Sequence, residues 1–241
     1  MQIIPVPIKK EIDSSDDVAD LILSSVDISE NDILVVAQKI ISKQEGRIVD
    51  LSTIRPSLLA EGISSQYQKD PRIVELILSE SKRIIRMKGG ILIVETNGGF
   101  ICANAGIDES NVKDGHATLL PINSDVSAQK IRDKIMNKTN KNVAIIISDT
   151  FGRPFRMGQT NHAIGISGLN PILDYEGTLD SFGKVLRVTA IAIADELSGA
   201  AELVMGKSLN HPVVLIRGYS FNVEDHLIDE LIRSENEDLF R

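Results

Sequence analysis

An unbroken apolar run with polar residues directly behind it is the feature that most constrains this chain. The run from Val143 to Ile147 (VAIII) is typical of a strand buried on both faces. Polar residues follow at once: Ser148, Asp149, Thr150, Arg153 and Arg156. Ligand sites in open α/β sheets lie beyond the carboxyl ends of strands, so this position predicts a site. A turn capped by Asp149 is the structural alternative, and the arginines favour the site because no turn requires them.

Composition narrows the classes of function. The net charge of −8 over 241 residues argues against a nucleic-acid binder, whose affinity comes from clustered cations. The lone cysteine, Cys102, excludes an internal disulfide or multi-cysteine zinc site, fits a reducing, cytoplasmic setting, and is expected in the core. No stretch approaches the ~18 apolar residues of a membrane span, so no membrane partner is expected.

Short apolar runs bounded by turn residues predict the remaining strands. The first, from Ile3 to Ile8, contains Pro5 and Pro7, which suit an edge strand because proline donates no hydrogen bond. The Asn97-Gly98-Gly99 sequence predicts a hairpin between two of the others. The other predicted strands are 33–37, 91–96, 100–103, 185–194 and 212–217.

Apolar residues at helical spacing predict five helices. The clearest spans Pro71 to Arg86, with Asp70 as its cap and three cations at its carboxyl end, where the helix dipole favours them. Ser14 or Ser15 would cap the first helix. The other predicted helices are 14–26, 127–138, 195–205 and 224–234, and the stretch 157–183 gives no clear prediction.

The mixture of strands and helices predicts a mixed α/β (α+β) fold, because strict alternation, as in a Rossmann fold or a barrel, is missing. The segment from Ala201 to Ser208 resembles a P-loop, but Ala201 replaces the first glycine and the segment follows a helix. It is therefore not a P-loop. Gly206, Lys207 and Ser208 could still contact a phosphate, and a helix C-cap with a dipole-complementing lysine is the alternative.

Three polar strand ends form the candidate site. Asp108 and Asp149 supply the hard oxygen ligands that Mg²⁺ or Mn²⁺ takes, and Thr150 adds a hydroxyl. Nearby cations would neutralise phosphate oxygens: Lys39, Lys43, Arg153 and Arg156. Carboxylates, a metal and surrounding cations are typical of nucleotide-driven phosphoryl chemistry. The hypothesis requires that these loops converge in the fold.

Four motifs carry a resemblance to a known family. They are ISKQEGRI (41–48), NAGIDESNV (104–112), SDTFGRPFRMGQTNHAIGISG (148–168) and ADELSGAAELVMGK (194–207). In this order and spacing they resemble the coenzyme F420-0:L-glutamate ligase family, also called the F420 gamma-glutamyl ligases. The likeness runs from the PVP sequence at 5–7 to VVLIRG at 213–218.

The resemblance implies a GTP-dependent ligase that joins L-glutamate to coenzyme F420-0. The carboxylate of F420-0 would be activated as an acyl phosphate and then attacked by the amine of glutamate. The family uses Mg²⁺ or Mn²⁺, is helped by K⁺ and forms a two-domain homodimer with its own mixed fold. We expect a larger domain from 1–85 with 185–241 and a smaller one from 86–184.

The resemblance also implies roles for particular residues. Asp108 and Asp149 would bind one metal, and Thr150 would help to bind a second. Asp149, Arg153 and Arg156 are placed at the catalytic step. The nucleotide would contact Lys9, Lys10, Glu11, Ile12, Gln38, Lys39, Lys43, Asn111, Met205, Gly206, Lys207 and Ser208.

Three positions in two segments depart from the pattern of the family. Some relatives carry Ser-Thr in place of Gln38-Lys39. Some carry an acidic or amide residue at Lys207, where it serves the second metal. A protonated lysine cannot be a metal ligand. Either the second metal is held differently, or Lys207 itself takes over the neutralisation of charge.

Two other functions remain as alternatives. A metal-dependent phosphohydrolase would use the same aspartates and threonine with water in place of an amine. A non-catalytic nucleotide-binding protein is disfavoured, because two carboxylates repel phosphate unless a metal intervenes. Dependence of GTP turnover on F420-0 separates the ligase from the hydrolase.

Overall fold

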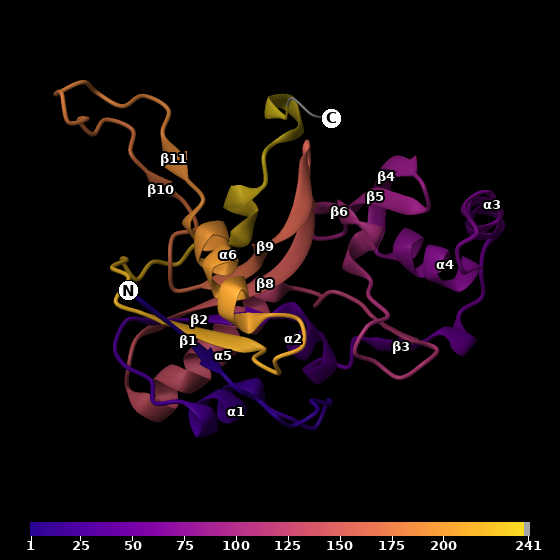
Figure 1. The fold of residues 1–241 in the computed structure, drawn as a ribbon, viewed down its shortest axis with the longest axis horizontal. Coiled ribbons are helices and arrows are strands. Elements are labelled where there is room, and N and C mark those ends of the chain that lie inside the picture. The colour runs from indigo at the N-terminus through magenta and orange to yellow at the C-terminus, as the bar shows by residue number, and fades with distance from the viewer. Residues whose placement is uncertain (239–241) are drawn as a thin grey trace.

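A five-stranded sheet forms the centre of the computed structural model, which describes residues 1–238 (Figure 1). Only the β2–β8 pair is parallel, and the other neighbours run antiparallel. The fold is therefore α+β, as the sequence predicts. In spatial order the strands are β1 (Gln2–Val6), β12 (Val213–Arg217), β2 (Asp32–Ala37), β8 (Val143–Arg153) and β9 (Arg156–Ser167).

Helices cover both faces of this sheet. Leu34 and Val36 of β2 face a core built with α1 (Val18–Ser25), α2 (Gln38–Gln44) and α5 (Ser124–Thr139). Ile33 and Val35 face the opposite core, built with α6 (Ile193–Met205). Burial of both faces explains why the central strands are continuous apolar runs instead of alternating ones.

A third core lies between residues 51 and 119, on the right in Figure 1. Its helices pack against a three-stranded sheet of order β4-β5-β6 and a two-stranded sheet of β3 and β7. The division into domains at residues 85 and 185 stays a prediction. The elements here are β3 (Ile48–Asp50), η1 (Leu51–Thr53), α3 (Leu58–Tyr67), α4 (Pro71–Ser79), β4 (Ser81–Lys88), β5 (Ile91–Thr96), β6 (Ile101–Ala103), η2 (Asn104–Gly106) and β7 (His116–Thr118).

Several local predictions are confirmed. The proline-containing β1 lies at the edge of the central sheet, where the missing N–H of Pro5 breaks no ladder. Strands β5 and β6 form the expected hairpin, in which Val94 pairs with Cys102. The strands predicted at 33–37 and 212–217, and the helices predicted at 127–138 and 195–205, match β2, β12, α5 and α6 with small shifts of their ends.

The helix predicted from Pro71 to Arg86 is wrong in its second half. Helix α4 ends at Ser79, and β4 begins at Ser81. Ile84 and Ile85 continue the helical spacing of α4, but β-branched residues also suit a strand, and pairing with β5 decides between the two. The cations Lys82, Arg83 and Arg86 therefore lie on a strand and not at a helix end.

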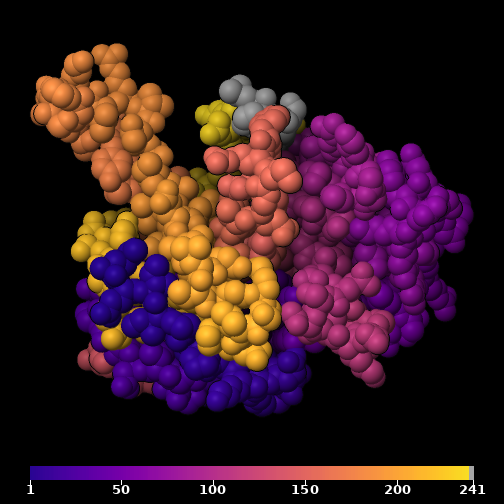
Figure 2. Space-filling model, in the orientation of Figure 1, coloured from indigo at the N-terminus to yellow at the C-terminus, as the bar shows by residue number. Residues whose placement is uncertain are grey.

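The strand predicted at 185–194 is wrong as well. Only Ala190–Ile191 forms a strand, β11, which pairs with β10 (Leu173–Asp174). Val185 meets Leu179 in an isolated bridge, because this segment has no wider sheet beside it. Residues 173–191 form an arm that stands away from the body of the molecule (Figures 1 and 2).

The predicted terminal helix at 224–234 is reduced to a single 3₁₀ turn, η3 (Ile228–Leu231), followed by η4 (Glu235–Glu237). Part of its backbone bonds to another element, because the N–H of Ile228 donates to the carboxylate of Asp125 in α5 at 3.2 Å. The first helix begins at Val18, later than predicted. Asp17 caps it by accepting from the N–H of Asp20, so neither Ser14 nor Ser15 is the cap.

The strand that begins at Val143 was predicted to end at Ile147, and this prediction is wrong. The strand continues to Arg153 and pairs with β9, which occupies the start of the stretch that gave no clear prediction. The register shifts between Ile147 and Ser148, and such bulges often redirect side chains beside active sites. Asp149 therefore lies within a strand and not in a turn.

Candidate functional site

The predicted polar loops converge on one cavity of about 640 Å³. Its walls come from the segment after β1, the start of α2, the loop after η2, the middle of β8 and the end of α6. This convergence is what the sequence hypothesis required. The predicted residues that line it are Lys10, Glu11, Ile12, Gln38, Lys39, Lys43, Asp108, Asn111, Asp149, Thr150, Met205, Gly206 and Lys207.

Lys9, Ser208, Arg153 and Arg156 are not among the lining residues. Because β8 continues as a strand to Arg153, it carries this residue to the hairpin tip, where Arg156 begins β9. There the guanidinium of Arg153 donates to the carbonyl of Met157 at 2.7 Å. Neither arginine lines this cavity, so their catalytic role stays a prediction.

A left-handed turn brings Asp108 into the cavity. Asn104, Ala105 and Gly106 have φ values of 53°, 55° and 69°. A Cβ at Gly106 would lie 2.7 Å from the side chain of Leu120, so the turn requires glycine there. The ammonium of Lys69 donates to the Asn104 side-chain oxygen at 3.0 Å and so anchors the start of the turn.

Asp108 is held as an ionised carboxylate. The Lys39 ammonium donates to it at 2.6 Å, and the N–H and hydroxyl of Ser110 donate at 2.7 and 2.8 Å. Burial alone would raise the pKa of Asp108, but these donors outweigh burial and leave the pKa below its ordinary value. Asp108 is therefore negatively charged at neutral pH.

Asp149 is in a different electrostatic setting. Burial, together with a smaller contribution from the charge of Asp108, raises its pKa from 3.8 to about 6 against the opposing effects of the Thr150 N–H, Lys207 and Lys39. The charge of Asp108 is among the causes of this shift, so the two carboxylates are close enough to interact electrostatically. Asp149 has no ion-pair partner within 4.0 Å among residues 1–238. A carboxylate in this state gains most from a nearby cation.

The hydroxyl of Thr150 is at the centre of a polar chain. It donates to the Asn161 side-chain oxygen at 2.7 Å and accepts from the Lys207 ammonium at 2.6 Å. Lys207 also lies 3.1 Å from a carboxylate oxygen of Glu202. Sequence reasoning missed Asn161 and Glu202. The pairing of Thr150 with Asn161 across β8 and β9 becomes visible only with the register of the hairpin.

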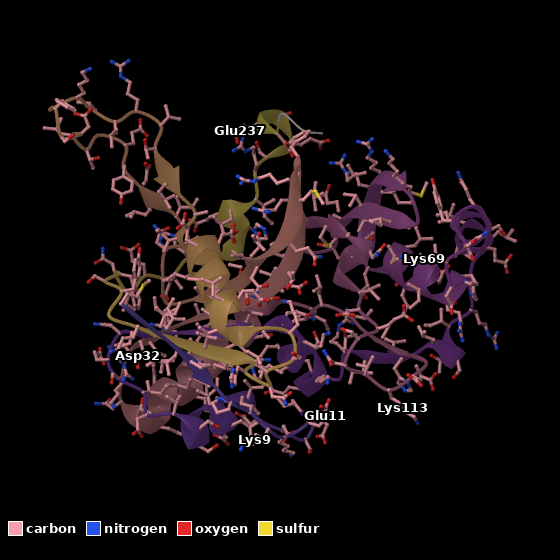
Figure 3. The ribbon with its side chains drawn as sticks, viewed as in Figure 1. Lys9, Glu11, Asp32, Lys69, Lys113 and Glu237 are labelled. Atoms are coloured by element: carbon pink, nitrogen blue, oxygen red, sulfur yellow. The ribbon has the colours of Figure 1, made fainter. Side chains whose placement is uncertain are left out.

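The ammonium of Lys43 is the most buried cation of the cavity. Its side chain is 7% exposed and is paired with Glu11, whose own side chain is 82% exposed. Glu11 belongs to the N-terminal segment at the lower edge of the molecule in Figure 3. The amide of Gln38 donates to Ser42 at 2.5 Å and to the carbonyl of Leu119 at 3.2 Å, which holds the first turn of α2 in place.

The donor set suits a divalent ion that arrives with phosphate. Asp108 and Asp149 face the same cavity, yet residues 1–238 contain no group of three His, Cys, Asp or Glu side chains that could hold a metal. Mg²⁺ is usually bound by one or two carboxylates together with substrate phosphates and water. Asp108 and Asp149 therefore suit a divalent ion of this kind.

Cys102 plays no part in this chemistry. It is buried, as expected for a core residue, and burial raises the pKa of its thiol to about 12. A thiol with so high a pKa is not a nucleophile at neutral pH.

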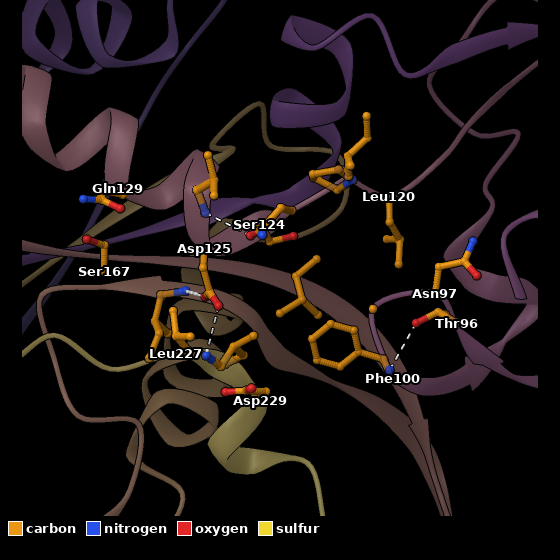
Figure 4. A pocket seen from close by; sticks show the side chains of 18 of the residues that line it. Thr96, Asn97, Phe100, Leu120, Ser124, Asp125, Gln129, Ser167, Leu227 and Asp229 are labelled. Carbon is orange, nitrogen blue, oxygen red and sulfur yellow. Dashed lines mark hydrogen bonds between the residues drawn. The ribbon is translucent and has the colours of Figure 1, made fainter. Parts of the chain in front are cut away.

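A second cavity, of about 840 Å³, is lined by residues that include Phe100, Asp125 and Leu227 (Figure 4). Ala105 lines this cavity, whereas its neighbours Asn104 and Gly106 line the first. Asp125 extends toward it but accepts from the N–H groups of Ile166 and Ile228 at 2.7 and 3.2 Å. Asp125 therefore joins β9 to the C-terminal segment and has a structural use.

No helix within residues 1–238 is both long enough and apolar enough to cross a membrane.

Comparison with known proteins identifies the family. Residues 8–218 match the model of the F420-0:Gamma-glutamyl ligase family. The chain is 46% identical over 238 residues to the coenzyme F420:L-glutamate ligase of Methanothermobacter thermautotrophicus, covering 95% of this chain and 94% of the relative. The enzymes of the same name from Methanopyrus kandleri and Methanocaldococcus jannaschii are 39% and 43% identical, covering 100% and 91% of this chain and 98% and 88% of theirs. The chain therefore belongs to the F420-0:Gamma-glutamyl ligase family.

Proposed function

We propose that this protein is a GTP-dependent ligase that forms an amide bond between L-glutamate and coenzyme F420-0. The observation that carries the proposal is the single cavity in which Asp108, Asp149 and Thr150 meet four lysines, in a chain of this family. The names of the relatives support the acid and the amine that are joined. The cations and carboxylates support a phosphorylated intermediate.

The cations of the cavity would bind the triphosphate. Lys43 is buried and paired with Glu11, so a phosphate oxygen would replace the carboxylate of Glu11 on its ammonium. Lys39 and Lys207 approach from α2 and from the end of α6. Asp108 and Asp149 would hold a divalent ion, which supplies further neutralisation of phosphate charge when bound. Together these groups hold the terminal phosphate in a fixed orientation.

Two displacements would complete the reaction. A carboxylate oxygen of F420-0 attacks the γ-phosphorus, the bond from that phosphorus to the β-phosphate oxygen breaks, and GDP leaves. The amine nitrogen of glutamate, free of its extra proton, then attacks the acyl carbon, and inorganic phosphate leaves with the oxygen that joined the two. The amide nitrogen gives up one proton to solvent. The part of the protein is to align the phosphate and to neutralise charge.

The deciding experiment uses the purified protein with GTP, Mn²⁺, L-glutamate and F420-0. We expect a product one glutamyl unit heavier than F420-0, with one GDP and one phosphate formed for each bond. GDP formation of the same rate without F420-0 would identify a phosphohydrolase instead. ATP in place of GTP serves as the control for base selection, and Asp149→Asn serves as the control for metal dependence.

We also propose that the protein is a homodimer. The arm of residues 173–191 exposes a series of apolar side chains to solvent, which is typical of surfaces that another chain covers. They include Leu179 at 65%, Phe182 at 89% and Val188 at 91% exposure. Light scattering should give twice the mass of one chain, and Phe182→Ser should shift the protein toward the mass of one chain. A monomeric wild-type protein would overturn this proposal.

The setting of the reaction follows from the same proposal. We expect the protein to act in the cytoplasm, where its lone thiol stays reduced and GTP is available. We further expect added K⁺ to raise turnover above that with Mg²⁺ or Mn²⁺ alone, and an equal concentration of tetramethylammonium chloride controls for ionic strength.

A further inference from the structure

Lys207 lies where the family resemblance implies a second divalent ion. Its ammonium is 2.6 Å from the hydroxyl oxygen of Thr150 and 3.1 Å from a carboxylate oxygen of Glu202. A hydroxyl and a carboxylate are the donors that a second ion would need on this side of the cavity. Both are already bound to a cation that is part of the chain.

The directions of the hydrogen bonds at Thr150 also disfavour a second ion there. Thr150 donates its hydrogen to the side-chain oxygen of Asn161 at 2.7 Å, so the oxygen of Thr150 turns a lone pair toward Lys207. A divalent ion would require that same lone pair. An ammonium that contacts it blocks the ion by its bulk and repels it by its charge.

Glu202 holds Lys207 in this position. One of its oxygens is paired with Lys207, and the other, Oε2, is buried and has no hydrogen-bond partner in the described part of the chain. The negative charge of this half-buried carboxylate favours a cation beside it, and Lys207, which contacts the first oxygen, is the cation that lies within 4.0 Å in the described part of the chain. The side chain of Glu202 is 24% exposed, whereas that of Lys207 is 65% exposed and extends into the cavity.

We propose that Lys207, held by Glu202 against Thr150, takes the place of a second divalent ion, so that each active site uses one divalent ion, held by Asp108 and Asp149. This inference rests on the proposed function, because it assumes that a nucleoside triphosphate occupies the cavity. A tethered ammonium neutralises phosphate charge without being lost when metal is removed.

The number of bound ions tests the proposal without any measurement of turnover. The protein is mixed with an equimolar amount of guanylyl imidodiphosphate, a GTP analogue that is not hydrolysed, and Mn²⁺ is titrated in. Electron paramagnetic resonance measures the free Mn²⁺, and calorimetry confirms that the nucleotide is bound. We expect one Mn²⁺ per wild-type chain.

Two variants and a control complete the design. Lys207→Glu supplies a carboxylate beside Thr150 and should bind two Mn²⁺ per chain. Lys207→Met removes the charge with little change of size, so it should keep one Mn²⁺ and bind the triphosphate analogue about tenfold more weakly. Lys130→Glu makes the same change of charge on the exposed side of α5, away from both the cavity and the arm, and should match the wild type in both measurements.

The possible results distinguish the role of Lys207 from the proposed ligase activity. Two Mn²⁺ per wild-type chain with the nucleotide bound would overturn the role of Lys207 and leave the proposed ligase intact. Equal nucleotide affinity in the wild type and in Lys207→Met would overturn it too. Failure of the wild type to bind the nucleotide at all would overturn the proposed function and this inference with it.

Discussion

Replacing Asp149 by asparagine should make the metal-free protein more stable while abolishing its metal-dependent activity. Burial raises the pKa of Asp149 from 3.8 to about 6. A carboxyl group whose pKa is higher in the folded state is harder to ionise there than in the unfolded chain. The ionised form therefore opposes folding, and asparagine removes that opposition while its oxygen can still accept from the N–H of Thr150.

The size of the effect follows from the shift. Roughly two pKa units at about 1.4 kcal/mol each give about 3 kcal/mol at pH 7.5. The cost of ionisation is absent below the unfolded pKa of 3.8 and fully present above the folded value of about 6. Between these limits it grows with pH, so the difference between Asp149→Asn and the wild type should be roughly half as large at pH 5.

Urea denaturation at pH 5 and pH 7.5, in the presence of a chelator, measures both free energies of unfolding. Mn²⁺ with the GTP analogue should then stabilise the wild type but not the variant, because only the wild type has both carboxylates. Asp108→Asn is the matched control, since the pKa of Asp108 is lowered and its removal should destabilise the protein. The reasoning would be refuted if Asp149→Asn were less stable than the wild type at pH 7.5. It would also be refuted if the difference between their free energies of unfolding were the same at pH 5 and pH 7.5.

Two further predictions concern the walls of the cavity. Lys69→Met removes the donor to Asn104 that anchors the left-handed turn, so the affinity for Mn²⁺ in the nucleotide complex should fall about tenfold through misplacement of Asp108; unchanged affinity would show that the turn holds without it. Glu11→Gln releases the buried ammonium of Lys43 and should tighten binding of the GTP analogue up to about fivefold, as calorimetry can measure. Weaker binding would show instead that the carboxylate of Glu11 itself contacts the nucleotide.

Local patterns were sufficient for the elements whose burial is continuous. Residues 33–37 of β2 and the first half of β8 are apolar throughout because helices cover each face of the sheet, so the sequence alone indicates that both faces are buried. The hairpin of β5 and β6 is marked by its own turn residues. Asp108 and Asp149 were identifiable for the same reason, since each follows an apolar segment abruptly.

Local patterns did not predict the elements whose conformation depends on pairing with segments far away in the sequence. The apolar spacing of α4 continues through Ile84 and Ile85, and only pairing with β5 makes that segment a strand. Residues 185–191, in the second half of the arm, have the composition of a strand but no wider sheet beside them to join. The contacts of Lys207 with Thr150 and of Lys43 with Glu11 link segments far apart in the chain, so no local pattern indicates them.

Transfer of an oxygen atom tests the central claim most directly. F420-0 labelled with ¹⁸O in both oxygens of its reacting carboxylate is incubated with GTP, Mn²⁺, L-glutamate and the protein, and the released phosphate is analysed by mass. If GTP activates that carboxylate as an acyl phosphate, each phosphate carries one ¹⁸O and each new amide retains one. Phosphate without ¹⁸O, formed alongside the glutamyl product or in its absence, would contradict the account.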